Sequence, residues 1–160
     1  MTQERSTRAT EWLQEQGADF SVVTTEPARS AEESAERQGI ELSRLLKTIV
    51  VRKSDSEHLF VLVPGDREID WKKLRAHVGV SRLSLPDRAT AEEVTGYKPG
   101  TITPFGAATK LPVILDASAA DADLVALGGG EHGVNVHVSA IDLRKLVDAE
   151  VADVTDLRAS

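Results

Sequence analysis

Two groups of residues in this chain have the types and spacing that recognition of a small polar ligand requires. The first is residues 96–106, where three glycines and two prolines fall within eleven residues. Neither a helix nor a central strand tolerates that density, because glycine loses the most backbone entropy on ordering and proline lacks an N–H donor. The stretch must be a shaped loop. Its accessible backbone N–H groups could wrap a ligand, and the alternative is a structural turn.

The second group centres on Lys47, at the join of a short helix and an apolar strand. Period-two alternation places Lys47 on the same face as Ile49 and Val51. If that face is the inner one, Lys47 lies at the rim of the core, where its ammonium could donate to a carbonyl or phosphate oxygen. The alternative is a lysine that extends its stem to solvent.

Three consecutive glycines, Gly128, Gly129 and Gly130, separate two apolar runs. As a phosphate cradle this is a weak signal, because a strand follows it and not the N-terminus of a helix. The alternative is a tight turn.

Several kinds of chemistry are excluded. The chain has no cysteine, so disulfides, zinc–thiolate sites and a cysteine nucleophile are absent. Its four histidines lack the spacing of metal ligands, and no serine-hydrolase, Walker or dinucleotide-binding glycine motif is present. We therefore expect no metal and no cofactor. The histidines are His58, His77, His132 and His137.

Length and charge limit the class of protein. At 160 residues the chain is expected to form one domain, residues 1–160. The net charge of −7 argues against a nonspecific nucleic-acid binder. Residues 1–5 lead into an amphipathic segment, which is not typical of a signal peptide, and no run is long enough to span a membrane. We expect a cytoplasmic protein.

The apolar pattern predicts an α+β fold with a mixed sheet. Two β-rich runs, 48–52 and 59–63, predict a hairpin, and further strands are expected at 20–23, 82–85, 112–116 and 134–138. Predicted helices cover 6–16, 31–38, 41–46, 70–78, 90–95 and the segment after Ser139, with Ser30, Asp70, Thr90 and Ser139 as N-terminal caps.

These segments together resemble a known family. Leu45-Leu46-Lys47-Thr48-Ile49-Val50-Val51 is followed by Thr95-Gly96-Tyr97-x-x-Gly100-x-x-x-Pro104-Phe105-Gly106 and then by Gly128-Gly129-Gly130 with a strand after it. The same motifs occur in this order in the YbaK / prolyl-tRNA synthetase-associated editing family. The resemblance runs from about residue 5 to about residue 155.

The resemblance implies a free-standing aminoacyl-tRNA deacylase that removes a wrong amino acid, such as cysteine or alanine, from tRNA, often the tRNA for proline. It implies a mixed, barrel-like sheet surrounded by helices, and a prolyl-tRNA synthetase as a further partner. Lys47 matches the functional lysine of the family. The other residues it assigns to substrate binding are Thr48, Gly100, Thr101, Ile102, Thr103, Pro104, Phe105, Gly106, Gly128, Gly129 and Gly130.

Two departures from the family pattern stand out. Glu131 and His132 occupy positions where some relatives carry basic side chains, and Gly128 stands where some have a hydroxyl residue. The first weakens the case for strong contact with the tRNA backbone, and both leave the amino acid open. The alternatives are a non-catalytic module that binds tRNA or a synthetase through the same fold, and a hydrolase of a small ester.

Overall fold

The computed structural model describes residues 6–159, so residues 1–5, on which part of the signal-peptide argument rests, lie outside the described residues. The α-helices are α1 (Arg8–Glu15), α2 (Ala31–Gln38), α3 (Trp71–Val78), α4 (Arg88–Thr95) and α5 (Ala140–Leu146). The strands are β1 (Ser21–Thr24), β2 (Leu46–Ser54), β3 (Glu57–Pro64), β4 (Arg67–Ile69), β5 (Val113–Asp116), β6 (Val125–Gly128), β7 (Val134–Val138), β8 (Glu150–Ala152) and β9 (Thr155–Leu157).

The strands form a mixed arrangement, which confirms the α+β prediction. A four-stranded sheet has the order β2-β3-β5-β8, with β2 antiparallel to β3 and the other pairs parallel. A three-stranded antiparallel sheet has the order β1-β7-β6, and β4 pairs with β9. A single bridge between Leu45 and Ala126 joins the two larger sheets, and they do not close into a barrel within residues 6–159. The barrel-like description was therefore too strong.

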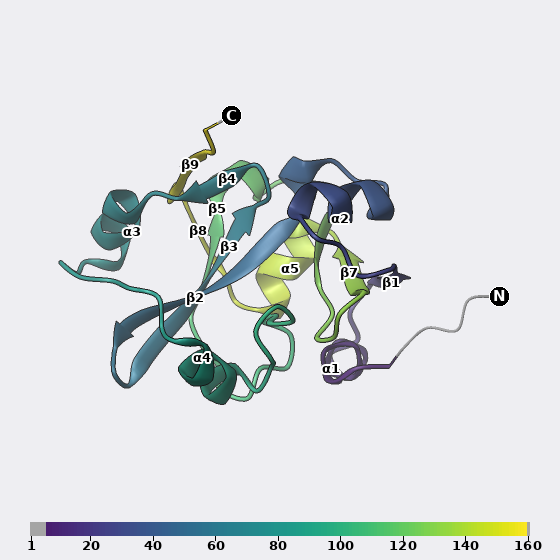
Figure 1. Ribbon diagram of the computed structural model, residues 1–160, viewed down its shortest axis with the longest axis horizontal. Coiled ribbons are helices and arrows are strands. Elements are labelled where there is room, and N and C mark those ends of the chain that lie inside the picture. The colour runs from purple at the N-terminus through teal and green to yellow at the C-terminus, as the bar shows by residue number, and fades with distance from the viewer. Residues whose placement is uncertain (1–5, 160) are drawn as a thin grey trace.

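Strand β2 runs between two apolar cores. Leu46 and Val50 belong to one core, while Val51 belongs to the other, with Ile49 packed against it. Figure 1 shows β2 as a long strand that crosses the molecule, with α3 toward one end and α1, β1 and β7 toward the other. Because successive side chains of a strand point to opposite faces, neighbouring residues of β2 must face different surroundings.

Local capping explains where most helices begin. The side chains of Ser30, Asp70 and Ser139 accept the backbone N–H three residues on, as predicted. Helix α4 differs, because Asp87 is its cap and the N–H of Thr90 donates to the Asp87 carboxylate at 2.7 Å. The predicted cap at Thr90 was wrong by three residues: aspartate offers the same acceptor one turn earlier.

Two other predictions need correction, and three strands were missed. The expected strand at 82–85 makes only one bridge, between Ser84 and Arg52. The expected helix at 41–46 is a single 3-10 turn, Leu42–Arg44. Strands β4, β8 and β9 were not predicted at all, because each has three residues and depends on a distant partner. No described helix is both long and apolar enough to cross a membrane.

Candidate active site

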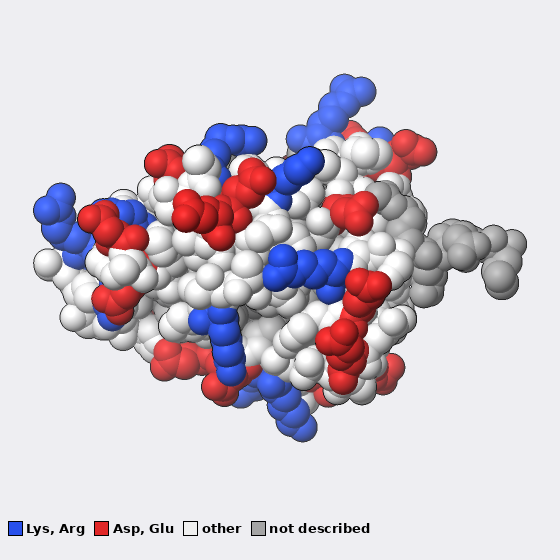
Figure 2. Space-filling model, turned by 90° about the horizontal axis from the view of Figure 1, so that it is seen from below, with Lys and Arg blue, Asp and Glu red and all other residues white. Residues whose placement is uncertain are grey.

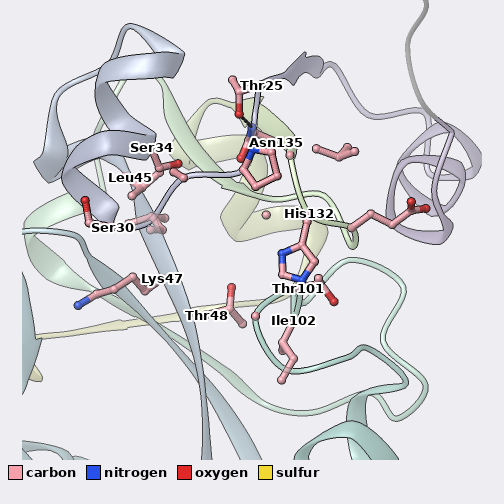
Figure 3. A pocket seen from close by; sticks show the side chains of 18 of the residues that line it. Thr25, Ser30, Ser34, Leu45, Lys47, Thr48, Thr101, Ile102, His132 and Asn135 are labelled. Carbon is pink, nitrogen blue, oxygen red and sulfur yellow. Dashed lines mark hydrogen bonds between the residues drawn. The ribbon is translucent and has the colours of Figure 1, made fainter.

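A pocket of about 450 Å³ opens at the start of β2, beside the bridge between Leu45 and Ala126 of β6. Its volume falls within the range of sites that hold small molecules. Four segments far apart in the sequence line it, as Figure 3 shows: 25–34, 45–49, 100–102 and 128–135. The predicted site residues that line it are Lys47, Thr48, Gly100, Thr101, Ile102 and Gly128.

Lys47 is half-buried at one end of this pocket. Its Nζ donates to the backbone oxygen of Arg67 at 3.1 Å. In Figure 3 its ammonium points away from Thr101 and His132. Burial is the main cause that lowers the pKa of Lys47 below its ordinary value, and the charge of Arg158 lowers it further. The rim position predicted from strand alternation therefore agrees with the structure, and the ammonium has a defined partner.

Thr48 faces the other way, as the next residue of a strand must. Its Oγ1 is buried and has no hydrogen-bond partner within the described residues. A buried hydroxyl left unpaired costs about 1–3 kcal/mol. Thr48 therefore lies in the wall of the pocket with its hydroxyl oxygen covered by the protein.

The loop of residues 96–106 is held in shape at its two ends. The Tyr97 hydroxyl donates to the backbone oxygen of Phe105, and the rings of Phe105 and Trp12 stack with centroids 6.1 Å apart. Burial raises the pKa of Tyr97 to about 12, so this hydroxyl keeps its proton. The guanidinium of Arg8 lies over the Tyr97 ring at 5.5 Å. These contacts fix the loop against α1 and leave its middle at the pocket.

Gly100 occupies the turn of this loop at a φ of +90°, a conformation that favours glycine. Thr101 closes the turn, because its N–H and its hydroxyl both donate to the backbone oxygen of Lys98. Within residues 6–159 the N–H groups of Gly100 and Ile102 donate no hydrogen bond. Two backbone donors are therefore available beside the pocket.

Gly128 ends β6, and Gly129 and Gly130 begin the turn of residues 129–133 that leads to β7. The N–H of Gly129 donates to the backbone oxygen of Val134 at 2.7 Å, and its own oxygen accepts from the Thr7 hydroxyl at 2.6 Å. This turn carries His132 to the pocket, where its imidazole lies near Thr101 in Figure 3. A Cβ built on Gly100 would lie 3.2 Å from Cε1 of the same imidazole.

Other predicted site residues do not line the pocket. Thr103 and Phe105 are fully buried beneath the loop, while Pro104 and Gly106 line a different hollow beside Trp12. Of the glycine turn, only Gly128 reaches the pocket. Gly129 packs against Val134, and Gly130 packs against Tyr97.

Sequence reasoning missed several polar residues of the pocket. Ser30 and Ser34 lie one turn apart at the start of α2. Asn135 donates through Nδ2 to the oxygen of Val23 at 3.0 Å, which ties β7 to β1 beside Thr25. The capping pattern at Ser30 was a visible signal for the helix but not for the pocket. Nothing local marked Asn135 or His132 as lining the same pocket as Lys47.

A larger hollow of about 530 Å³ lies between the β2–β3 hairpin and the end of α3, lined by residues that include His58, His77 and Glu150. None of the predicted site residues line it. Within residues 6–159 no cluster of histidine, aspartate and glutamate side chains could hold a metal ion.

The chain has an α+β fold with a pocket of about 450 Å³ at the start of β2. The family model described as "Aminoacyl-tRNA editing domain" matches residues 25–146, well over half of the chain. The chain therefore belongs to the aminoacyl-tRNA editing domain family. This confirms the resemblance that the lysine, loop and glycine motifs indicated.

Named relatives agree with this family. The chain is 26% identical over 137 residues to EbsC of Enterococcus faecalis, named as a candidate Cys-tRNA(Pro)/Cys-tRNA(Cys) deacylase, covering 86% of this chain and 84% of that protein. It is 28% identical over 145 residues to the multifunctional Ser/Thr-tRNA deacylase ProXp-y of Escherichia coli K12, covering 88% and 87%. A solved structure described as a candidate trans-editing enzyme for prolyl-tRNA synthetase superimposes with a TM-score of 0.85 at 28% identity, covering 96% and 99%.

Gly100→Val should abolish activity through the shape of the loop. A Cβ at Gly100 would meet Cε1 of His132 at 3.2 Å, and the positive φ adds about 1–2 kcal/mol of strain. Gly79→Val is the matched control, because Gly79 has a φ of +81° but a Cβ there would meet nothing within 4 Å. Both variants should lose similar stability in thermal unfolding, and only Gly100→Val should lose deacylation. A folded Gly100→Val protein with normal rates would show that the loop is only a turn.

Proposed function

We propose that this chain is a free-standing deacylase, one editing domain that acts in the cytoplasm on a tRNA carrying a wrong amino acid. One observation carries the proposal. Every residue that lines the pocket, from Thr25 to Asn135, lies inside the segment 25–146 that matches the editing-domain family. The pocket is therefore built from the part of the chain that defines the family.

The candidate substrates are Cys-tRNA(Pro) and Ala-tRNA(Pro), with a prolyl-tRNA synthetase as a further partner. EbsC is named for cysteine, ProXp-y for serine and threonine, and the matching solved structure for a prolyl-tRNA synthetase. Cysteine, alanine, serine and threonine share a small side chain. A pocket walled by Thr48, Ile102 and small hydroxyl residues is suited to that class.

The reaction requires little from the protein, because an aminoacyl ester is already activated. The oxygen of a water molecule bonds to the carbonyl carbon, the bond from that carbon to the ribose oxygen breaks, and the ribose oxygen takes up a proton. The N–H groups of Gly100 and Ile102 would donate to the oxyanion that develops. Such a donor is worth about 3–4 kcal/mol in the transition state.

Lys47 would supply a positive charge at the end of the pocket, for the ester carbonyl, a ribose hydroxyl or a phosphate of the tRNA end. Thr48 would contact the aminoacyl group from the wall of the pocket. His132 lies where it could orient the attacking water. For a cysteine substrate, the thiol of the substrate could attack its own ester instead of water.

The direct test is deacylation of a panel of tRNAs for proline charged with cysteine, alanine, serine or proline. We expect faster loss of at least one small, wrong amino acid than of proline, after subtraction of spontaneous hydrolysis. Binding to these tRNAs without turnover would favour the non-catalytic module. Turnover of simple esters with no effect on any charged tRNA would favour the small-ester hydrolase.

Lys47→Ala should leave the fold intact and remove most deacylation. We expect a loss of about 100-fold or more in kcat, the size that follows from removing one electrostatic group of an active site. The free energy of unfolding should change by less than about 1 kcal/mol, because a lysine at the rim of the core contributes to stability mainly through the apolar stem of its side chain.

Lys53→Ala is the matched control for that change. Lys53 lies on the same strand but is exposed, with Nζ 3.9 Å from Glu57. Its removal should leave turnover unchanged. Full activity in a folded Lys47→Ala protein would exclude Lys47 from the site.

Contact with tRNA should involve few phosphates. Figure 2 shows acidic and basic side chains interspersed over the face it presents, without a continuous basic surface. Arg52 is paired with Asp55 and Lys53 with Glu57. Within residues 6–159, Arg44 and Lys98 have no ion pair and lie next to pocket segments.

We expect the slope of log affinity against log salt to correspond to roughly two to four phosphates, at about 0.7–0.9 per contact. Arg44→Ala and Lys98→Ala should each reduce the slope by about one contact. Arg52→Ala, whose side chain is already paired, should not. A steep slope, or equal effects of all three changes, would contradict this assignment of the tRNA contacts.

A further inference from the structure

The position of Lys47 depends on a strand that lies outside the pocket. Its ammonium is held by the backbone oxygen of Arg67, the first residue of β4. Strand β4 has three residues and pairs with β9 near the C-terminus, as Figure 1 shows. An isolated two-stranded ribbon is marginally stable in water, so something else must fix β4 in place.

Buried polar groups fix it through the side chain of Arg67. Arg67 Nε donates to Thr155 Oγ1 at 2.7 Å, and Nη2 donates to the Thr155 backbone oxygen at 3.3 Å. The carboxylate of Asp116 lies 3.7 Å from the same Nε and also accepts the N–H of Val154 at 3.1 Å. Thr155 is 0% exposed and Asp116 is 1% exposed. Neither residue lines the pocket.

We propose that the Arg67–Thr155–Asp116 network holds the carbonyl that anchors the Lys47 ammonium, and that Thr155 is a positioning residue for deacylation. This rests on the proposed function, in which Lys47 acts at the end of the pocket. The ammonium of a lysine, at the end of a flexible four-carbon side chain, can occupy many positions in solvent. A fixed carbonyl selects one of them, and misplacement of a catalytic group by about 1 Å can cost 100-fold in rate.

The pKa of Lys47 is a second quantity, besides the rate, that should respond to the network. Burial and Arg158 lower the pKa of Lys47, while Glu68, Glu32 and Asp66 raise it. If the carbonyl of Arg67 moves, the ammonium can reach solvent, and the burial that lowers its pKa is relieved. The pKa of Lys47 should then rise toward its ordinary value, and the amine should react more slowly with acylating reagents at a given pH.

The experiment compares Thr155→Val with Thr155→Ser in the full chain. Thr155→Val keeps the shape of the side chain and removes the Oγ1 acceptor of Arg67 Nε. We expect kcat to fall about 10- to 100-fold with little change in KM. Thr155→Ser restores the oxygen and should restore most of the rate. The extent of Lys47 acetylation by acetic anhydride is measured by mass spectrometry at a series of pH values. The pH at which Lys47 becomes reactive should be higher in Thr155→Val than in the unchanged protein or in Thr155→Ser.

Lys73→Met is the matched control for loosening β9. Lys73 Nζ contacts Asp153, Asp156 and the Thr155 backbone oxygen, so it ties the same strand to α3. It shares that oxygen with Arg67 Nη2, but its removal leaves the bond between Arg67 Nε and Thr155 Oγ1 in place. This variant should lose some stability but keep the turnover and the labelling profile of Lys47. If Thr155→Val does not fold, Arg67→Gln removes the bond to Thr155 Oγ1 from the other side, together with the bond to the Thr155 backbone oxygen and the ion pair with Asp116, and carries the same expectations.

Two results separate this inference from the proposed function. A folded Thr155→Val protein with normal turnover and a normal Lys47 labelling profile would overturn the positioning role, while an inactive Lys47→Ala protein would leave the function standing. Full activity of Lys47→Ala would overturn the proposed function instead.

Discussion

Alternation of side chains along β2 is the constraint on which the site depends. Both faces of this strand pack against apolar cores, so a shift of one residue would move the side chains of each core into the other. The register is therefore strongly fixed, from the pairing of Leu46 with Pro64 onward. It sends Thr48 into the wall of the pocket and Lys47 to the opposite face, where its long stem reaches the pocket end.

The remaining parts of the site are brought to β2 by contacts that lie away from the chemistry. The Tyr97–Phe105 hydrogen bond and the stack on Trp12 hold the glycine–proline loop. The Thr7 hydroxyl holds the turn at Gly129. Buried phenylalanine and tyrosine side chains thus place backbone N–H groups at the pocket, which is suited to a reaction that needs positioning and charge stabilisation more than a nucleophile.

Sequence reasoning succeeded where the signal was local. Apolar runs predicted the β2–β3 hairpin, the glycine–proline density predicted the loop, and strand alternation predicted Lys47 at a rim. It failed where distant partners decide the structure: β4 and β9 exist through pairs such as Arg67 and Thr155, 88 residues apart. Asn135 reaches the pocket because β7 pairs with β1, and nothing beside it in the sequence shows this.

Binding of the aminoacyl end of a tRNA in this pocket is tested most directly by amide NMR titration. The ligand is adenosine that carries alanine at its 3′ position through a non-hydrolysable amide. We predict shifts at Thr48, at residues 100–102 and at Gly128, with little change around His58 and His77 in the second hollow. Shifts concentrated in that second hollow, or no shifts at millimolar ligand, would contradict binding of the aminoacyl end in the pocket.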